Sequence, residues 1–141
     1  MTLENAIMSA VAARLQAVPA LSGVSVVQGN ADSVITIPRI AVDAVRQGVS
    51  IPGYAVYGVR LEVTVVANSW SAAQDGVSGN QEIETLFAAV ENSLTGNLSS
   101  LTNSDVIVHG ARWDGSVSDV REGRVISRKW DITLEASPLT D

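Results

Sequence analysis

The chain has 141 residues and no cysteine, and its fifteen acidic and nine basic residues give a formal charge of −6 at pH 7. This length suits a single domain, residues 1–141, whose core needs no disulfide or metal, and the 46% hydrophobic content excludes intrinsic disorder. The absence of cysteine excludes thiol catalysis and cysteine-ligated zinc, and the net negative charge disfavours non-specific binding to nucleic acid or anionic membranes.

The N-terminal region predicts an amphipathic helix. Thr2 is placed to cap it, Glu4 suits the positive end of its dipole, and Pro19 ends it. The few basic residues on its polar face favour packing on a sheet over lying on a membrane. The first four residues lack the features of a secretory signal, and no apolar run approaches the roughly 20 residues that span a bilayer, so we expect synthesis in the cytoplasm. The apolar stripe consists of Leu3, Ile7, Val11, Leu15 and Val18.

Two extended segments are predicted next, at residues 23–28 and 33–45, with turn-forming residues between them. Because proline cannot donate to a strand ladder, the region around Pro38 is either an edge strand or extended chain that becomes a strand afterwards. The second alternative, with the strand starting near Arg39, is favoured. Residues 47–53 contain Gly48, Pro52 and Gly53 and are predicted to form a loop.

Residues 56–67 give the clearest strand signal, because apolar and polar side chains alternate along them. One face requires a hydrophobic core, and the other requires water or a partner. The first face holds Tyr57, Val59, Leu61, Val63 and Val65, and the second holds Gly58, Arg60, Glu62 and Thr64.

A polar stretch at residues 68–80 is predicted to be a mobile or partner-binding loop, in which Trp70 either folds back on the core or anchors an interface. A second amphipathic helix follows at residues 83–94. Ser78 and Gln81 suggest a capping box before it, and Gly96 suggests its end. The glutamates on its polar face are interpreted as solvated, and they are too scattered to predict a metal site.

The chain closes with two predicted strands, 106–113 and 125–136, joined by a long hairpin tip at 114–123. If the last strand pairs with strand 56–67, Arg60 and Glu62 lie opposite Asp131 and Lys129. Each such charge pair at an exposed site contributes well under about 1 kcal/mol. Its main effect is to favour one register of strand pairing, and its effect on stability is smaller. The sequence therefore predicts an α+β fold, with a mostly antiparallel sheet and two amphipathic helices packed on one face.

No residue pattern predicts catalysis, a metal or a cofactor. The single histidine, His109, lies in a predicted strand where it alternates with Ile107, Ala111 and Trp113, and no nucleophile or orienting group accompanies it in sequence. The glycines lack the pattern of a phosphate-binding loop. The basic residues between 121 and 129 are interleaved with acidic ones and lack stacking aromatics, which favours a solvated hairpin or a charged subunit contact over nucleic-acid binding.

The order of these elements resembles the tail-terminator, or tail-completion, proteins of long-tailed bacteriophages. The resemblance covers most of the chain and rests on pattern and order. It is carried by the N-terminal helix, the proline-containing segment 35–42, the strand 59–67 (VRLEVTVVA), the helix 83–94, and the closing strand with residues 127–134 (SRKWDITL).

The resemblance implies a non-enzymatic virion protein, assembled in the host cytoplasm, that forms a homo-oligomeric ring, expected to be a hexamer. Such a ring caps the tail tube, meets the head connector or stopper protein, and lets DNA pass through its lumen without specific binding. Another neck or tail-tube component is an alternative, as is a small ligand-binding domain or enzyme that uses the strand of His109. The residues expected at subunit or tube contacts are Arg60, Glu62, Trp70, Trp113, Arg121, Arg124, Lys129 and Asp131.

Overall fold

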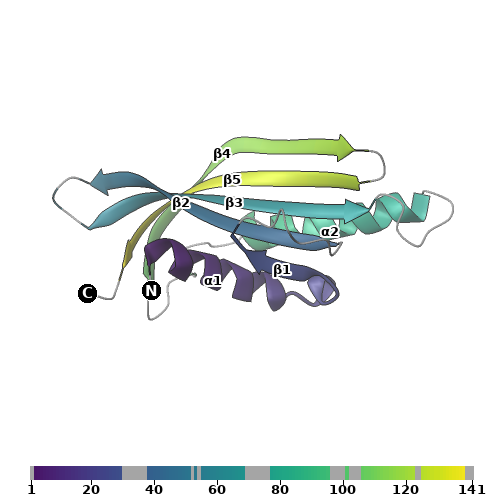
Figure 1. Ribbon diagram of the computed structural model, residues 1–141, viewed down its shortest axis with the longest axis horizontal. Coiled ribbons are helices and arrows are strands. Elements are labelled where there is room, and N and C mark those ends of the chain that lie inside the picture. Colours follow the sequence, from purple (N-terminus) through teal and green to yellow (C-terminus); the bar gives the residue numbers. More distant parts are fainter. Residues whose placement is uncertain are drawn as a thin grey trace.

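The computed structural model describes residues 2–29, 38–51, 53, 55–68, 77–95, 101, 106–122 and 125–138. Five strands form one sheet in the order β1-β2-β3-β5-β4, in which β1 and β2 pair in parallel and the other neighbours are antiparallel. The two helices lie on the same side of this sheet (Figure 1). In chain order the elements are α1 (Leu3–Gln16), the short 3-10 helix η1 (Pro19–Leu21), β1 (Ser25–Gln28), β2 (Arg39–Ile51), β3 (Val56–Asn68), α2 (Val77–Thr95), β4 (Val106–Glu122) and β5 (Val125–Pro138).

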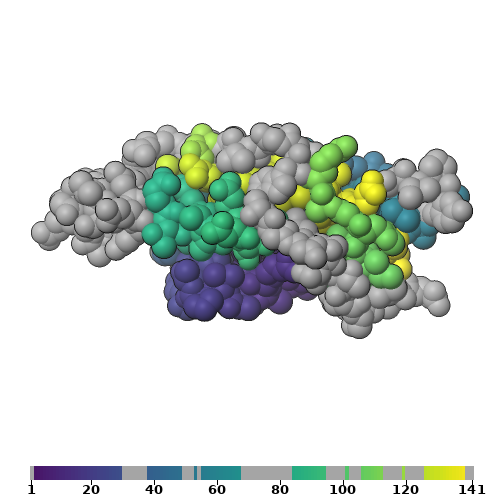
Figure 2. Space-filling view, turned by 180° about the vertical axis from the view of Figure 1, so that it is seen from behind, coloured from purple at the N-terminus to yellow at the C-terminus, as the bar shows by residue number. Residues whose placement is uncertain are grey.

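This arrangement confirms the predicted fold class, and its core lies between the helices and one face of the sheet. The alternation in β3 holds, since Val59, Leu61, Val63 and Val65 are all fully buried. Among the described residues, Trp130 on β5 is the largest fully buried side chain, and its ring meets Phe87 of α2 edge to face, with centroids 6.1 Å apart. Figure 2 shows α1 (purple) and α2 (teal) side by side over this face.

Helix α1 starts as its sequence predicts. The Thr2 side chain accepts a hydrogen bond from the backbone N–H of Asn5 at 3.2 Å, which satisfies one of the free donors of the first turn. The helix ends at Gln16, two residues before the last residue of its predicted apolar stripe, Val18. Among the described residues, no helix combines the length and hydropathy needed to cross a membrane.

Strand β2 begins at Arg39, directly after Pro38, as predicted, but it does not end where a loop was expected. The prediction of a loop is wrong for residues 47–51, because β2 continues to Ile51 and stays paired with β3, whereas Gly53 lies in a turn as predicted. The ladder shifts between Arg46 and Gly48, and Gly48 has a φ of 134° that only glycine adopts readily. Gly48 therefore lies at an irregularity within the strand and does not end it.

Helix α2 begins at Val77, so Ser78 lies inside it and the predicted capping box is wrong. Its apolar side is as expected, with Phe87, Val90 and Leu94 buried in the core. The predicted stop at Gly96 and most of the predicted loop, including Trp70, lie outside the described residues.

The predicted long hairpin tip at 114–123 is also wrong. Strand β4 runs on to Glu122 and β5 starts at Val125, so residues 123 and 124 separate the two strands. Pairing with β5 is interrupted between Trp113 and Val117, where the predicted turn pair Asp114-Gly115 falls. These residues interrupt the ladder without ending the strand.

Candidate interaction surface

The side of the sheet that faces away from the helices carries most of the polar side chains of the central strands, and no described element covers it (Figure 1). The helices bury the odd-numbered residues of β3 from Val59 to Val65, so the even-numbered residues point to the other side. We call this surface the open face. Its members are Asp43 on β2, Arg60, Glu62 and Thr64 on β3, Gly110 and Arg112 on β4, and Lys129, Asp131, Thr133 and Glu135 on β5.

Three carboxylates form one row across the open face. Glu62 on β3 lies directly opposite Asp43 on one side and Asp131 on the other. Like charges in directly opposite positions repel each other and destabilise a sheet. The row therefore needs cations close by.

Arg60 and Lys129 supply those cations from the rows on either side. Arg60 Nη2 lies 3.3 Å from Asp131 Oδ2, and its Nε lies 3.4 Å from Glu62 Oε1. Lys129 Nζ lies 3.4 Å from Glu62 Oε1 and 3.9 Å from Asp131 Oδ1. The structure thus brings together the four charges that the sequence predicted to meet. The cross-strand pairs run diagonally, because the residue directly opposite Arg60 is Thr133.

Within this network the cations are more exposed than the anions. The side chains of Arg60 and Lys129 keep 41% and 37% of their surface exposed, against 27% for Glu62 and 9% for Asp131. Asp131 Oδ1 is buried without a hydrogen-bond partner. Within this network, the two cations therefore lie closer to solvent than the carboxylates that they contact.

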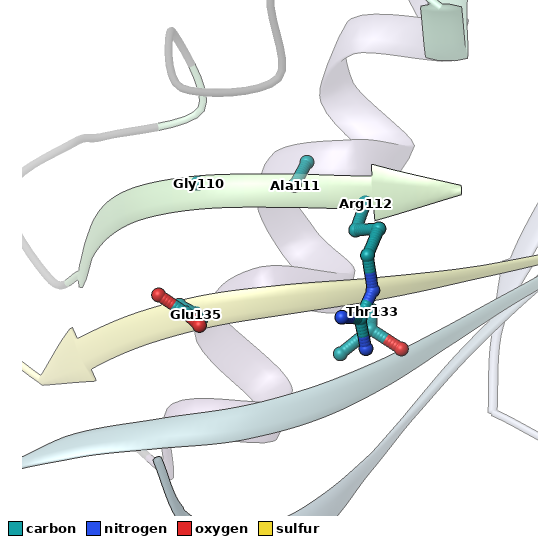
Figure 3. Close-up of a pocket in the computed structure, with 5 residues that line it drawn as sticks. All are labelled: Gly110, Ala111, Arg112, Thr133 and Glu135. Carbon is teal, nitrogen blue, oxygen red and sulfur yellow. The ribbon is translucent and has the colours of Figure 1, made fainter. Parts of the chain in front are cut away.

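A shallow depression of about 210 Å³ lies at the β4 side of the open face. It forms where Gly110 contributes no side chain, next to a shift in the β4–β5 register between Val108 and Gly110. Figure 3 shows the Arg112 side chain reaching across β5 over Thr133. This volume is below the usual range for small-molecule sites and suits a single side chain of a partner better. The lining residues are Gly110, Ala111, Arg112, Thr133 and Glu135.

On the helix side of the sheet, Arg128 of β5 contacts both α2 and the C-terminal part of β4. Its Nε and Nη2 donate to Asp119 Oδ1 and Oδ2 at 2.7 and 2.9 Å, and its guanidinium lies 4.5 Å from the centre of the Phe87 ring. The hydrogen bonds from Arg128 lower the pKa of Asp119, and those same bonds raise the pKa of Arg128. The pair is a two-point contact that fixes the end of the β4–β5 hairpin.

This contact predicts a small acid sensitivity. Because the folded-state pKa of Asp119 is lowered, the pair stabilises the fold above the ordinary value of 3.8, and this contribution is lost as the pH falls through the lowered pKa. We expect Asp119→Asn to lower the free energy of unfolding by less than about 1 kcal/mol at pH 7, since the side chain is partly exposed. Urea titrations of the wild type and Asp119→Asn at pH 7 and near pH 2.5 measure this difference in the free energy of unfolding. A difference between variant and wild type that persists unchanged at the lower pH would contradict this assignment.

His109 lies on the surface, with its Nε2 2.8 Å from the hydroxyl of Ser137. The predicted regular alternation with Ala111 and Trp113 is interrupted, because the β4–β5 register shifts between Val108 and Gly110 and His109 has no partner in the ladder. In the described part of the chain, no three side chains of the histidine, cysteine, aspartate or glutamate type come together in a way that could hold a metal ion.

Replacing His109 with glutamine tests its role directly. Glutamine can keep one hydrogen bond to Ser137, so we expect the free energy of unfolding to change by less than about 0.5 kcal/mol and self-association to stay as in the wild type. Denaturant titration and sedimentation velocity measure these two quantities. A complete loss of function in a stably folded variant would instead support the enzyme alternative.

Of the other residues predicted at contacts, the structure describes the backbone of two and the side chain of none. Trp113 and Arg121 belong to β4, opposite Ile132 and Ile126 of β5, and their side chains lie outside the described residues, as do Trp70 and Arg124. Sequence reasoning placed Thr133 and Glu135 on the polar side of the last strand, but it missed Asp43 and Arg112 as members of the surface. For Asp43 a signal existed, because it alternates with the buried Val42 and Ala44.

Comparison with known proteins gives a match in structure but none in sequence. No protein-family model matches the chain, and no curated protein matches it. A solved structure described as "Virion of native gene transfer agent (GTA) particle" contains a chain with the same fold, with a TM-score of 0.69 at 16% sequence identity. The match covers 94% of this chain and 96% of that chain. At this identity the likeness establishes a shared fold over nearly the whole length of both chains.

Proposed function

We propose that this chain is a non-enzymatic structural protein of a phage-like virion, and specifically a tail terminator that forms a ring at the end of the tail tube. The observation that carries the proposal is the fold shared, nearly end to end, with a chain of a gene transfer agent virion. It agrees with the resemblance to tail terminators in the order of the sequence elements. The shared fold and the order of the sequence elements therefore favour the same class, a structural protein of a phage-like virion.

The open face supports an assembly role. A charged surface of ion pairs offers contacts to another protein, and its shallow depression is smaller than the pockets that small molecules usually occupy. In this proposal Arg60, Glu62, Lys129 and Asp131 lie at contacts with a neighbouring subunit or the tube. Trp70, Trp113, Arg121 and Arg124 are proposed to extend those contacts.

The proposed ring joins the tail tube to the head connector in the neck of the virion. Its copies contact each other, the tube protein and the connector, and DNA passes through the lumen. The formal charge of −6 suits this position, because a negative surface repels phosphate and lets DNA pass without adhering.

The experiment is to delete the gene for this chain from its parent particle and to image the products by electron microscopy. A terminator predicts tails of irregular, extended length that do not join to heads, and supply of the chain from a plasmid restores normal particles. Tails of uniform length that fail to join heads would indicate a different neck component and refute the terminator assignment. Normal particles in its absence would refute the virion role altogether.

A further inference from the structure

Both edges of the five-stranded sheet contain backbone that no described strand pairs with. At one edge, β4 pairs with β5 on its inner side only. At the other edge, β1 pairs with Arg39–Val42 of β2, whereas β2 runs on to Ile51, so no described strand lies outside β2 after Val42. An unpaired edge presents N–H and C=O groups that can pair with a strand of another chain. Each copy therefore carries two different strand edges open to a neighbour.

On the β2 edge, the outward backbone groups after Val42 belong to Ala44. The Val42 carbonyl accepts from the N–H of Gly29, just beyond β1, at 2.7 Å, so the backbone groups of Val42 point away from β3. Because the direction of these groups alternates along a strand, those of Ala44 point the same way. The Asp43 carboxylate accepts from the Ala44 N–H at 3.0 Å. A side chain thus occupies the donor that a further strand would use.

On the β4 edge, the same alternation directs the backbone groups of Ala111 outward. In an antiparallel ladder, two directly opposite residues point their backbone groups either both toward or both away from each other. This rule carries the direction found on β2 across the sheet to Ala111. The directly opposite pairs that carry it are Asp43–Glu62, Leu61–Ile132 and Thr133–Arg112.

Placing Ala44 of one copy opposite Ala111 of the next also matches the shapes of the two edges. Strands β2 and β4 run in opposite directions, so side by side they form an antiparallel pair. In this register Val45 lies opposite Gly110, on the open face. Among the described residues, Val45 is the one large hydrophobic side chain that is exposed, at 50%. It projects beside the depression that Gly110 leaves, which suits a single side chain.

The same register pairs opposite charges. Asp43 lies at the outer end of the carboxylate row, and the cations of the network contact the other two members, Glu62 and Asp131. Across the edge Asp43 meets Arg112 of the next copy, a cross-strand pair of opposite sign. The Arg112 side chain extends over Thr133 within one copy (Figure 3) and turns outward when the strands pair. A register shifted by two residues loses both the charge match and the shape match.

We propose that β2 of one copy pairs with β4 of the next copy as antiparallel strands, with Ala44 opposite Ala111. The inference rests on the proposed function and names the contact through which the ring subunits meet. The paired segment is short, because β1 covers β2 up to Val42 and the pairing of β4 with β5 is interrupted after Trp113. The contact joins two different edges head to tail and, where its rotation closes, generates a ring.

Disulfide cross-linking tests this register, because the chain has no cysteine of its own. Directly opposite residues outside the hydrogen-bonded pairs have Cα atoms about 4.5 Å apart, which a disulfide can bridge, whereas positions two residues out of register are about 7–8 Å apart. Val45 is exposed, and a Cβ added at Gly110 meets nothing within 4 Å. Val45→Cys and Gly110→Cys should therefore keep thermal midpoints near that of the wild type.

An equimolar mixture of these two variants, oxidised with glutathione disulfide, should give at least about tenfold more linked dimer on non-reducing gels than the out-of-register mixture of Val45→Cys with Arg112→Cys. Asp43→Cys with Arg112→Cys is a second in-register pair, which should also link and serves if Gly110→Cys does not fold.

The inference is overturned if an in-register mixture of folded variants does not link, or if the out-of-register mixture links equally well. It is also overturned if Gly110→Cys alone links as readily as the mixture, which would indicate a two-fold contact between β4 edges. The deletion experiment measures the virion role in the particle itself. These outcomes therefore refute the strand contact without refuting that role.

Discussion

Replacing Trp130 with alanine should lower the free energy of unfolding by about 4 kcal/mol, which is a large fraction of the stability of a domain of this size. Trp130 is fully buried on β5, an inner strand that pairs with β3 on one side and β4 on the other. Its ring packs edge to face with Phe87, and its N–H donates to Glu91. The alanine variant leaves a cavity that the strands on both sides cannot collapse to fill.

Urea unfolding followed by circular dichroism measures this loss without relying on tryptophan fluorescence. Two control variants separate the contributions: Trp130→Phe keeps an aromatic ring and should lose about half as much, and Glu91→Gln keeps a hydrogen-bond acceptor and should lose less than about 1 kcal/mol. A loss below about 1 kcal/mol for Trp130→Ala would show that this residue is not at the centre of the core.

Removing both cations of the open-face network should have the second-largest effect. In the double variant Arg60→Met with Lys129→Met, the directly opposite carboxylates of Glu62 and Asp131 lose the charges that compensate them. We expect a loss of about 2 kcal/mol at pH 7, which is smaller than for a fully buried pair because the cations are partly exposed. Methionine keeps most of the length of each side chain, so the loss reports on charge more than on packing.

Arg112→Met is the matched control, since it removes one positive charge from the same surface outside this network, and we expect it to cost less than about 0.5 kcal/mol. The single variants of Arg60 and Lys129 complete a double-mutant cycle. The losses should not be additive, because each cation contacts both carboxylates. A double variant no less stable than Arg112→Met would mean that the network contributes nothing measurable to the fold.

The parts of the fold that the sequence predicted correctly are those where local pattern and tertiary packing agree. The two-residue period of β3 identified both its buried valines and its polar side, and Pro38 marked the point where β2 begins. The predictions failed where turn-forming residues lie inside long strands. Gly48 and the pair Asp114-Gly115 favour turns locally, but pairing with β3 and β5 continues past them through irregularities in the ladder.

The composition of the open face could also be predicted in part from the sequence. Alternation alone placed Arg60, Glu62, Lys129 and Asp131 on one face, whereas the register that makes their cross-strand contacts diagonal depends on strand pairing that no local pattern encodes. The depression beside Gly110 arises from a register shift and was invisible in the sequence for the same reason.

The central claim is that this chain is a structural subunit at the head–tail junction of a phage-like virion. Cryo-electron microscopy of the intact parent particle tests it most directly. The account predicts a ring of density between tail tube and head connector into which copies of this five-stranded, two-helix subunit fit, with the open face of each at a contact with a neighbouring subunit or the tube. A well-resolved junction built entirely from other chains, with this fold absent from the particle, would contradict it.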